Sequence, residues 1–104
     1  MTESNLEFIG KLEHIVRSRL ENPVGDSYTA TLATAGTKRI AQKVGEEGIE
    51  LALAAVTGDR DEIINEAADL VYHMIVLLSE QGLTLADVAT QLESRHSDRA
   101  VRSD

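Results

Sequence analysis

Two groups of acidic residues lie at equal distances on either side of one helix break. They are Glu46, Glu47 and Glu50 before the break at Thr57-Gly58-Asp59, and Glu66 and Asp69 after it. Glu50 and Glu66 are each eight residues from Gly58, and Glu47 and Asp69 are each eleven residues from it. If two antiparallel helices meet at this break, the pairs lie at matching heights, roughly 12 Å and 16 Å from the turn. The spacing therefore predicts a helix hairpin in which carboxylates converge.

The composition predicts an all-α fold. Of the 104 residues, 42% are hydrophobic but only 3% are aromatic, and there is a single proline. An aliphatic chain with few breakers favours helices, and no stretch shows the alternation of a half-buried strand. We expect a compact bundle of about four to five helices around the central antiparallel hairpin. This domain should span residues 1–93, with residues 94–104 forming a polar, frayed C-terminal tail.

The helix after the break is more apolar than one core-facing stripe requires. Its second half, from Leu70 to Leu78, is apolar nearly all round. Such a helix needs cover on several sides, while a chain of this length builds only a modest core. We therefore expect a second copy of the chain to complete the bundle as a homodimer.

The formal net charge of −8 argues against general nucleic-acid binding. The same charge means that an anionic substrate needs a metal or a local basic cluster to approach. No apolar run is long enough to span a bilayer, and no signal pattern precedes the first polar helix. We expect a cytoplasmic protein without a membrane partner. The absence of cysteine excludes disulfides and thiolate metal sites.

The paired acidic groups favour a divalent metal site over a solvated helix face. A single Glu-Glu-x-x-Glu sequence is usually just solvated, but Glu66 and Asp69 are set in an apolar stretch. A free carboxylate there is costly unless it is paired or bound to metal. An all-oxygen site suits Mg²⁺, with Mn²⁺ as a second candidate. The helical register makes Glu46 a weaker ligand candidate than Glu47. Three roles stay open for it: a metal ligand, a base that activates water, or a merely exposed residue.

Three basic residues upstream of the glutamates leave two interpretations open. Lys43 lies four residues before Glu47, so it forms either a helix ion pair or a contact to substrate phosphate. Lys38 and Arg39 lie near the start of the same helix and either bind phosphate too or are simply solvated.

His73 follows Asp69 by one helical turn. A lone histidine on an apolar helix is more often a core residue with satisfied ring nitrogens than a ligand. Tyr28 and Tyr72 are able to place a hydroxyl near a substrate, although packing is the commoner role.

A magnesium-carboxylate site of this kind predicts phosphoanhydride hydrolysis, because the metal binds polyphosphate oxygens and activates water. The sequence has no Gly-x-x-x-x-Gly-Lys-[Ser/Thr] loop, so it is not a P-loop enzyme. It also lacks an HExxH zinc motif and a Ser-His-Asp arrangement.

The acidic motifs, Glu-Glu-x-x-Glu followed by Glu-x-x-Asp, resemble those of the all-α, MazG-like nucleoside triphosphate pyrophosphohydrolases. The short sequence motifs around them are more specific and resemble those of the phosphoribosyl-ATP pyrophosphatase family of histidine biosynthesis. They are Ser27-Tyr28-Thr29-Ala30, Gly36-Thr37-Lys38-Arg39-Ile40, Gln42-Lys43-Val44-Gly45-Glu46-Glu47 and Glu66-Ala67-Ala68-Asp69-Leu70-Val71-Tyr72-His73. The resemblance covers roughly residues 6–93.

This resemblance implies hydrolysis of phosphoribosyl-ATP to phosphoribosyl-AMP and pyrophosphate, by attack between the α and β phosphates. It implies that Glu47, Glu50, Glu66 and Asp69 hold magnesium, and that Glu46 is a ligand or the base for water. It also implies phosphate contacts by Lys43 with Lys38 or Arg39, and a compact helical dimer.

The family's pathway neighbour, phosphoribosyl-AMP cyclohydrolase, is often fused to this domain, and we expect it here on a separate chain. Two other functions stay open: a house-cleaning pyrophosphohydrolase acting on free nucleoside triphosphates, and a non-enzymatic helical dimerisation module.

Overall fold

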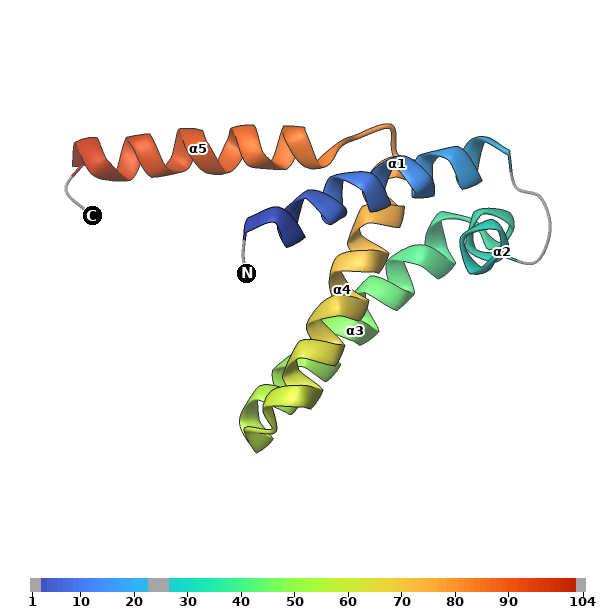
Figure 1. The fold of residues 1–104 in the computed structure, drawn as a ribbon, viewed down its shortest axis with the longest axis horizontal. Helices are drawn as coiled ribbons and strands as arrows, with labels where there is room; N and C mark the ends of the chain where they lie inside the picture. Colours follow the sequence, from blue (N-terminus) through green and yellow to red (C-terminus); the bar gives the residue numbers. More distant parts are fainter. Residues whose placement is uncertain (1–2, 23–26, 103–104) are drawn as a thin grey trace.

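The computed structural model describes residues 3–22 and 27–102, and every regular element in these ranges is a helix. The elements are a short 3-10 helix, η1 (Glu3–Leu6), and the α-helices α1 (Glu7–Glu21), α2 (Tyr28–Ala35), α3 (Thr37–Thr57), α4 (Arg60–Glu80) and α5 (Leu85–Arg102). The all-α prediction is thereby confirmed. Figure 1 shows α3 and α4 side by side, with α1 crossing near their upper ends and α5 leaving from the end of α4.

The central antiparallel hairpin is α3 and α4, joined at the predicted break. Gly58 ends α3 in the left-handed conformation, with φ of 82°, and its N–H donates to the carbonyl of Ala54 at 3.0 Å. Glycine adopts this conformation without the Cβ clash that other residues meet. Asp59 then caps α4, because its side chain accepts a hydrogen bond from the backbone N–H of Glu62 at 3.1 Å. Two adjacent residues thus end one helix and start the next.

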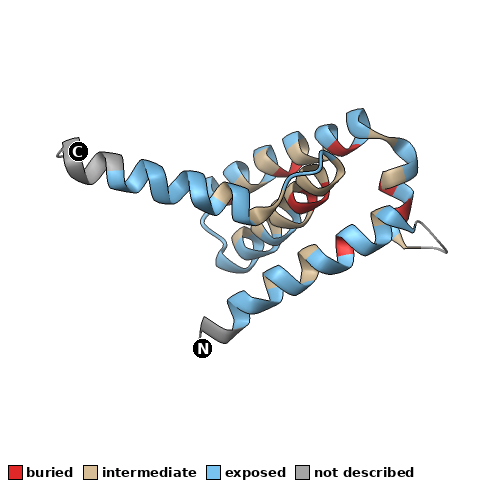
Figure 2. Ribbon diagram, turned by 90° about the horizontal axis from the view of Figure 1, so that it is seen from above, coloured by how far each residue is buried: buried red, intermediate tan, exposed pale blue. Residues whose placement is uncertain are grey.

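The hydrophobic core lies at the open end of the hairpin, where α1 and α2 pack against it. Its fully buried members come from four helices: Val16, Leu32, Ile40, Ile75 and Val76. Burying an aliphatic side chain of this size stabilises the fold by about 1.5–3 kcal/mol. Figure 2 shows most of the buried positions at this end. Among the described residues, no helix has the length and hydropathy needed to cross a membrane.

Helix α5 begins with a reciprocal cap and continues further than expected. The N–H of Thr84 donates to the Asp87 carboxylate at 2.9 Å, and the N–H of Asp87 donates to the Thr84 hydroxyl at 3.1 Å. The Leu85 N–H donates to the carboxylate of Glu13 at 2.7 Å, which ties the start of α5 to α1. The segment from Ser94 was expected to fray, but it is helical as far as Arg102.

Replacing Gly58 by alanine should destabilise the fold by about 1 kcal/mol, because alanine pays the steric cost of the left-handed conformation. No atom outside the turn lies within 4 Å of a Cβ built at Gly58, so backbone strain is the whole effect. Gly10 in α1 is the matched control: its added Cβ also meets nothing, and its φ is helical. Gly10→Ala should stabilise by about 0.5–1 kcal/mol. Urea unfolding measures both, and equal effects of the same sign would contradict the role given to Gly58.

Candidate metal centre

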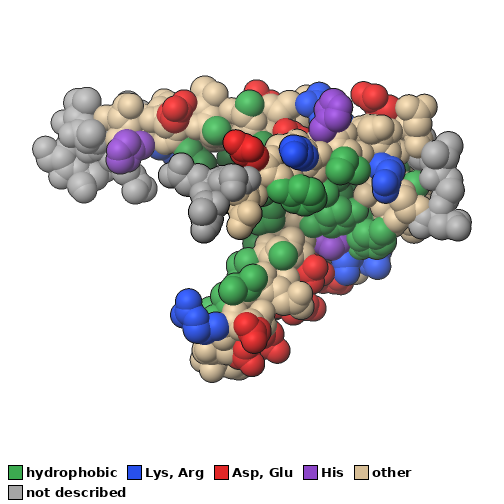
Figure 3. Space-filling model, in the orientation of Figure 1, with side chains coloured by type: hydrophobic (Ala, Val, Ile, Leu, Met, Phe, Trp, Pro, Cys, Tyr) green, Lys and Arg blue, Asp and Glu red, His purple; other side chains and the backbone are tan. Residues whose placement is uncertain are grey.

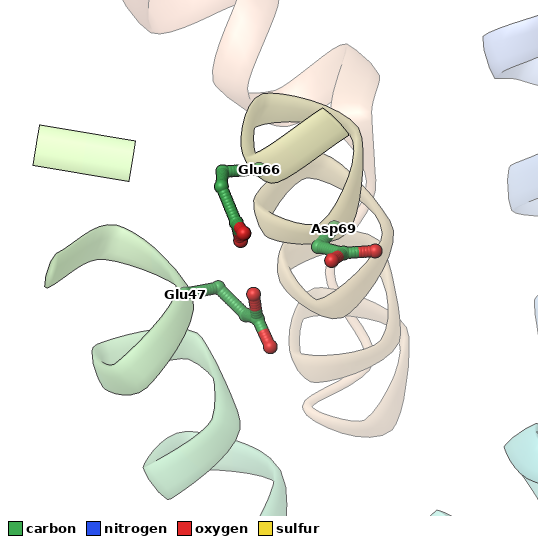
Figure 4. A group of neighbouring side chains, drawn as sticks. All are labelled: Glu47, Glu66 and Asp69. Atoms are coloured by element: carbon green, nitrogen blue, oxygen red, sulfur yellow. The ribbon is translucent and has the colours of Figure 1, made fainter. Parts of the chain in front are cut away.

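Three carboxylates from the two hairpin helices converge at one place. Glu47 comes from α3, and Glu66 and Asp69 come from α4. One oxygen from each lies within 4.8 Å of the other two. Figure 4 shows the Glu47 side chain reaching from its helix toward the two side chains of α4. The hairpin register that the sequence predicts thus brings Glu47, Glu66 and Asp69 together.

Two oxygens of this group are buried and have no hydrogen-bond donor among the described residues. They are Oε1 of Glu47 and Oε1 of Glu66, and the Glu47 residue is only 6% exposed. A buried, unpaired carboxylate oxygen is costly, and a cation supplies the missing partner. Hard divalent cations take such all-oxygen ligand sets, and opposite ligands of Mg²⁺ lie about 4.2 Å apart. The donor set therefore fits a hard divalent cation.

Glu50 and Glu46 lie beside this group rather than in it. Glu50 is exposed on α3, and it is one of the acidic neighbours that act on Glu66. Glu46 accepts a hydrogen bond from the side-chain amide of Gln42 at 2.9 Å, and its side chain is 44% exposed. The cluster is thus three carboxylates with Glu50 adjacent to it and Glu46 turned toward solvent.

The crowding of acids raises the pKa of Glu66 above its ordinary value of 4.5. Desolvation is the largest cause, followed by the neighbouring carboxyl group of Glu50 and then by the negative charges of Glu47 and Asp69. The site thus favours one added proton, or a cation in its place.

Lys43 is the basic side chain that contacts this group. Its Nζ lies 3.4 Å from Oε2 of Glu47 and 3.7 Å from Oε1 of Glu46. The predicted helix ion pair is therefore present. Burial alone would lower the pKa of Lys43, but Tyr28, Glu47 and Glu46 together raise it, so the ammonium stays charged. Its side chain is 21% exposed, which leaves part of the head group accessible to a ligand.

Lys38 and Arg39 lie in the first turn of α3, and both are exposed. Arg39 precedes Lys43 by one helical turn, which places it further along the same side of the helix. In the part of the chain that the structure describes, neither residue forms an ion pair with the cluster. Figure 3 shows basic and acidic side chains next to one another on the right flank of the hairpin.

His73 is a buried residue whose two ring nitrogens are both hydrogen-bonded. Nδ1 lies 2.8 Å from the carbonyl oxygen of Asp69, and Nε2 lies 2.9 Å from the hydroxyl of Tyr28. The prediction of a satisfied core histidine is confirmed. The hydroxyl of the neighbouring Tyr72 is hydrogen-bonded to that of Thr29, so two side-chain bonds join α2 to α4. The sequence motifs Ser27-Tyr28-Thr29-Ala30 and Tyr72-His73 contain all four residues of this network, but neither motif predicts the bonds between them.

Comparison with known proteins shows the family. A family model described as phosphoribosyl-ATP pyrophosphohydrolase matches residues 9–96, which includes every residue of the cluster. The chain belongs to the phosphoribosyl-ATP pyrophosphohydrolase family. The resemblance seen in the sequence words is thereby confirmed.

Curated members of this family are close to the chain in sequence. The histidine biosynthesis bifunctional protein HisIE of Vibrio cholerae is 53% identical over 94 residues, which are 90% of this chain and 45% of that protein. The protein of the same name from Campylobacter jejuni is 52% identical over 89 residues, which are 86% of this chain and 43% of that protein. The chain thus spans less than half the length of these relatives.

Lowering the pH should stabilise the metal-free protein in the interval between 4.5 and the raised pKa of Glu66. Within it the folded state holds the Glu66 proton more tightly than the unfolded state, so stability falls as the pH rises through the interval. Below pH 4.5 Glu66 is protonated in both the folded and the unfolded state, so it no longer makes stability depend on pH. Urea midpoints measured in a chelator across this range test the effect.

The variant Glu66→Gln should lose this part of the pH dependence. The control Glu62→Gln removes an exposed carboxylate one turn earlier on α4 and should keep it. Identical pH profiles for the wild type and Glu66→Gln would contradict the crowding described here.

Proposed function

We propose that the protein hydrolyses phosphoribosyl-ATP to phosphoribosyl-AMP and pyrophosphate, the second step of histidine biosynthesis. The observation that carries the proposal is the carboxylate cluster with its two buried, unpaired oxygens. Family membership supports the substrate, since the matching family is described by hydrolysis of this nucleotide. The relatives' name, which includes histidine biosynthesis, supports the pathway.

Within this proposal, Glu47, Glu66 and Asp69 hold Mg²⁺, and Mn²⁺ suits the same oxygens. Glu50 is the proposed fourth carboxylate, because it follows Glu47 by three residues on α3 and its charge acts on Glu66. The bound ion supplies Lewis-acid chemistry for the phosphate oxygens and for the attacking water. Glu46, whose side chain is 44% exposed beside the cluster, is our candidate for the base that accepts a proton from that water.

The basic residues of α3 orient the substrate in this scheme. Lys43 already lies at the cluster and has an accessible head group, so it contacts phosphate. Arg39 and Lys38 extend positive charge along the first turns of α3. On a chain of net charge −8, this short basic stretch lowers the repulsion that an anionic nucleotide meets near the cluster.

Purified protein should release pyrophosphate from phosphoribosyl-ATP in a reaction that needs Mg²⁺. The variants Glu47→Gln and Asp69→Asn should each lower kcat/KM by about a hundredfold or more, because each removes a charged ligand worth several kcal/mol. Circular dichroism should show that their helices persist. Glu62→Gln on the exposed face of α4 is the control and should keep full activity.

The same assay separates the alternatives. Faster turnover of dCTP or dUTP than of phosphoribosyl-ATP would favour the house-cleaning enzyme. An absence of magnesium-dependent pyrophosphate release from all of these substrates would leave the helical dimerisation module. Full activity of either cluster variant would contradict the ligand set.

We also propose that the protein is a homodimer, although the exposed apolar face differs from the predicted one. The second half of α4 is largely covered within the chain, while Ile49, Leu53 and Val56 form an exposed stripe along α3. Figure 3 shows hydrophobic side chains along the left flank of the hairpin. The radius of gyration is 15.7 Å, against about 13 Å for a compact domain of this length. A second copy packed on the hairpin covers the stripe and makes the assembly compact.

Sedimentation at micromolar concentration should therefore give the mass of a dimer. Leu53→Lys should shift it toward the monomer, because Leu53 is 61% exposed in one chain and becomes buried in the dimer. Leu6→Lys, at an equally exposed position in η1, is the control and should remain dimeric. A monomeric wild type would contradict the proposal.

A further inference from the structure

One aromatic ring lies half exposed beside the helix that carries two of the cluster carboxylates. Tyr28, the first residue of α2, is 47% exposed. Its hydroxyl lies 2.9 Å from Nε2 of His73 on α4, and Nδ1 of the same imidazole lies 2.8 Å from the carbonyl oxygen of Asp69. Two hydrogen bonds through one imidazole therefore join Tyr28 to a residue of the cluster. The mechanism proposed above gives Tyr28 no role.

His73 places this ring at one end of the cluster. It follows Asp69 by four residues and Glu66 by seven, so all three residues lie on one face of α4. Four residues of helix rise about 6 Å, so His73 lies one turn beyond Asp69, on the side away from Gly58. In a nucleotide, one ribose separates the phosphate from the base. A nucleotide whose phosphates lie at the cluster can therefore place its base next to Tyr28.

The hydroxyl of Tyr28 is already in use. The Asp69 carbonyl is only an acceptor, so Nδ1 of His73 carries a hydrogen. In the neutral imidazole Nε2 is then an acceptor, and the hydroxyl of Tyr28 donates to it. With its one hydrogen donated, Tyr28 has none to give to a substrate phosphate. What it still offers a ligand is the surface of its ring.

Neighbouring side chains fix the orientation of the ring and cover only part of it. The ring of Tyr72 stacks on Tyr28, with centroids 6.0 Å apart and planes inclined by 26°. The ring of His73 meets it edge to face, with centroids 5.6 Å apart. Tyr72 is itself hydrogen-bonded to buried Thr29, so a second bond joins the aromatic pair to α2. These contacts take one face and the hydroxyl end, so the exposed part of Tyr28 includes the other face.

We propose that the free face of the Tyr28 ring stacks with the adenine base of the substrate. Every base has a flat π surface, and a ring whose orientation is already fixed loses little freedom when it binds one. The sequence has three aromatic side chains, and Tyr28 is the one that combines an exposed ring with a hydrogen bond to the cluster-bearing face of α4. This inference rests on the proposed function, because it takes the phosphates of the nucleotide to lie at the cluster.

The test compares a ligand that has the base with one that lacks it. AMP and ribose 5-phosphate share the sugar and the phosphate, and neither contains the phosphoanhydride bond that the enzyme would cleave. Calorimetry with Mg²⁺ gives a dissociation constant for each ligand. The wild type should bind AMP about tenfold more tightly or better, the size expected for a base stacked on an aromatic ring. Equal affinities, or no measurable binding of AMP, would overturn the proposal.

Three variants show whether Tyr28 provides this preference. Tyr28→Leu removes the ring and should bring the ratio of the two affinities close to one. Tyr28→Phe removes the hydrogen bond to His73 but keeps the ring, so it should keep most of the preference. Phe8→Leu, at an aromatic position in the first turn of α1 that is 56% exposed, is the matched control and should leave the ratio unchanged.

The ratio is measured within one protein, so a general loss of binding in a variant cancels from it. A preference that survives in Tyr28→Leu would overturn the proposal. So would an equal loss in Tyr28→Phe and Tyr28→Leu, because the hydrogen bond rather than the ring would then be responsible.

An NMR measurement reports the contact directly. The sequence has two tyrosines, so Tyr72→Phe leaves Tyr28 as the source of every tyrosine ring signal. A stacked adenine should shift these signals, whereas ribose 5-phosphate should leave them nearly in place. Unshifted signals at saturating AMP would overturn the proposal.

These binding measurements separate this inference from the proposed function, because they need no turnover. A wild type that binds AMP through Tyr28 but does not hydrolyse phosphoribosyl-ATP would contradict the proposed function and support the stacking. A wild type that hydrolyses phosphoribosyl-ATP but binds AMP and ribose 5-phosphate equally would contradict the stacking alone.

Discussion

The mutual repulsion of carboxylates held together by the hairpin is the constraint on which the rest of the structure depends. Glu47, Glu66 and Asp69 cannot move apart freely, because the core at one end of the hairpin and the Gly58 turn at the other fix the two helices. The cluster lies between these two anchors. The buried aliphatic side chains therefore stabilise a site that is itself unfavourable without a cation, as functional sites often are.

The equal numbers of residues from Gly58 predicted how far along its helix each carboxylate lies from the turn. They did not predict the direction in which each side chain points around the helix axis. Glu47 and Asp69 match in both respects, so they meet. Glu46 lies about 100° of rotation from Glu47, which turns it to solvent and to Gln42. Glu50 was expected at the height of Glu66, but it is exposed and lies outside the group of three converging carboxylates. A helical register read from sequence thus gives a short list of site residues, and packing decides which of them converge.

Other features depend on contacts that no local pattern encodes. The Tyr28–His73 bond joins residues 45 positions apart, and it forms because buried Leu32 seats α2 against the core. The extent of α5 was missed for a different reason. Residues 94–102 are polar but contain neither glycine nor proline, so nothing stops a helix that the Thr84–Asp87 cap has started. A polar composition therefore does not predict fraying here, because polarity indicates only which side of a helix meets water.

Lys43 links the two halves of the proposed chemistry. The Lys43 ammonium forms an ion pair with Glu47, one of the carboxylates that would hold the cation. A cation bound by Glu47 weakens that ion pair, and the lysine charge is then available to phosphate. Binding of cation and nucleotide should consequently favour each other, and by linkage the coupling is the same in both directions.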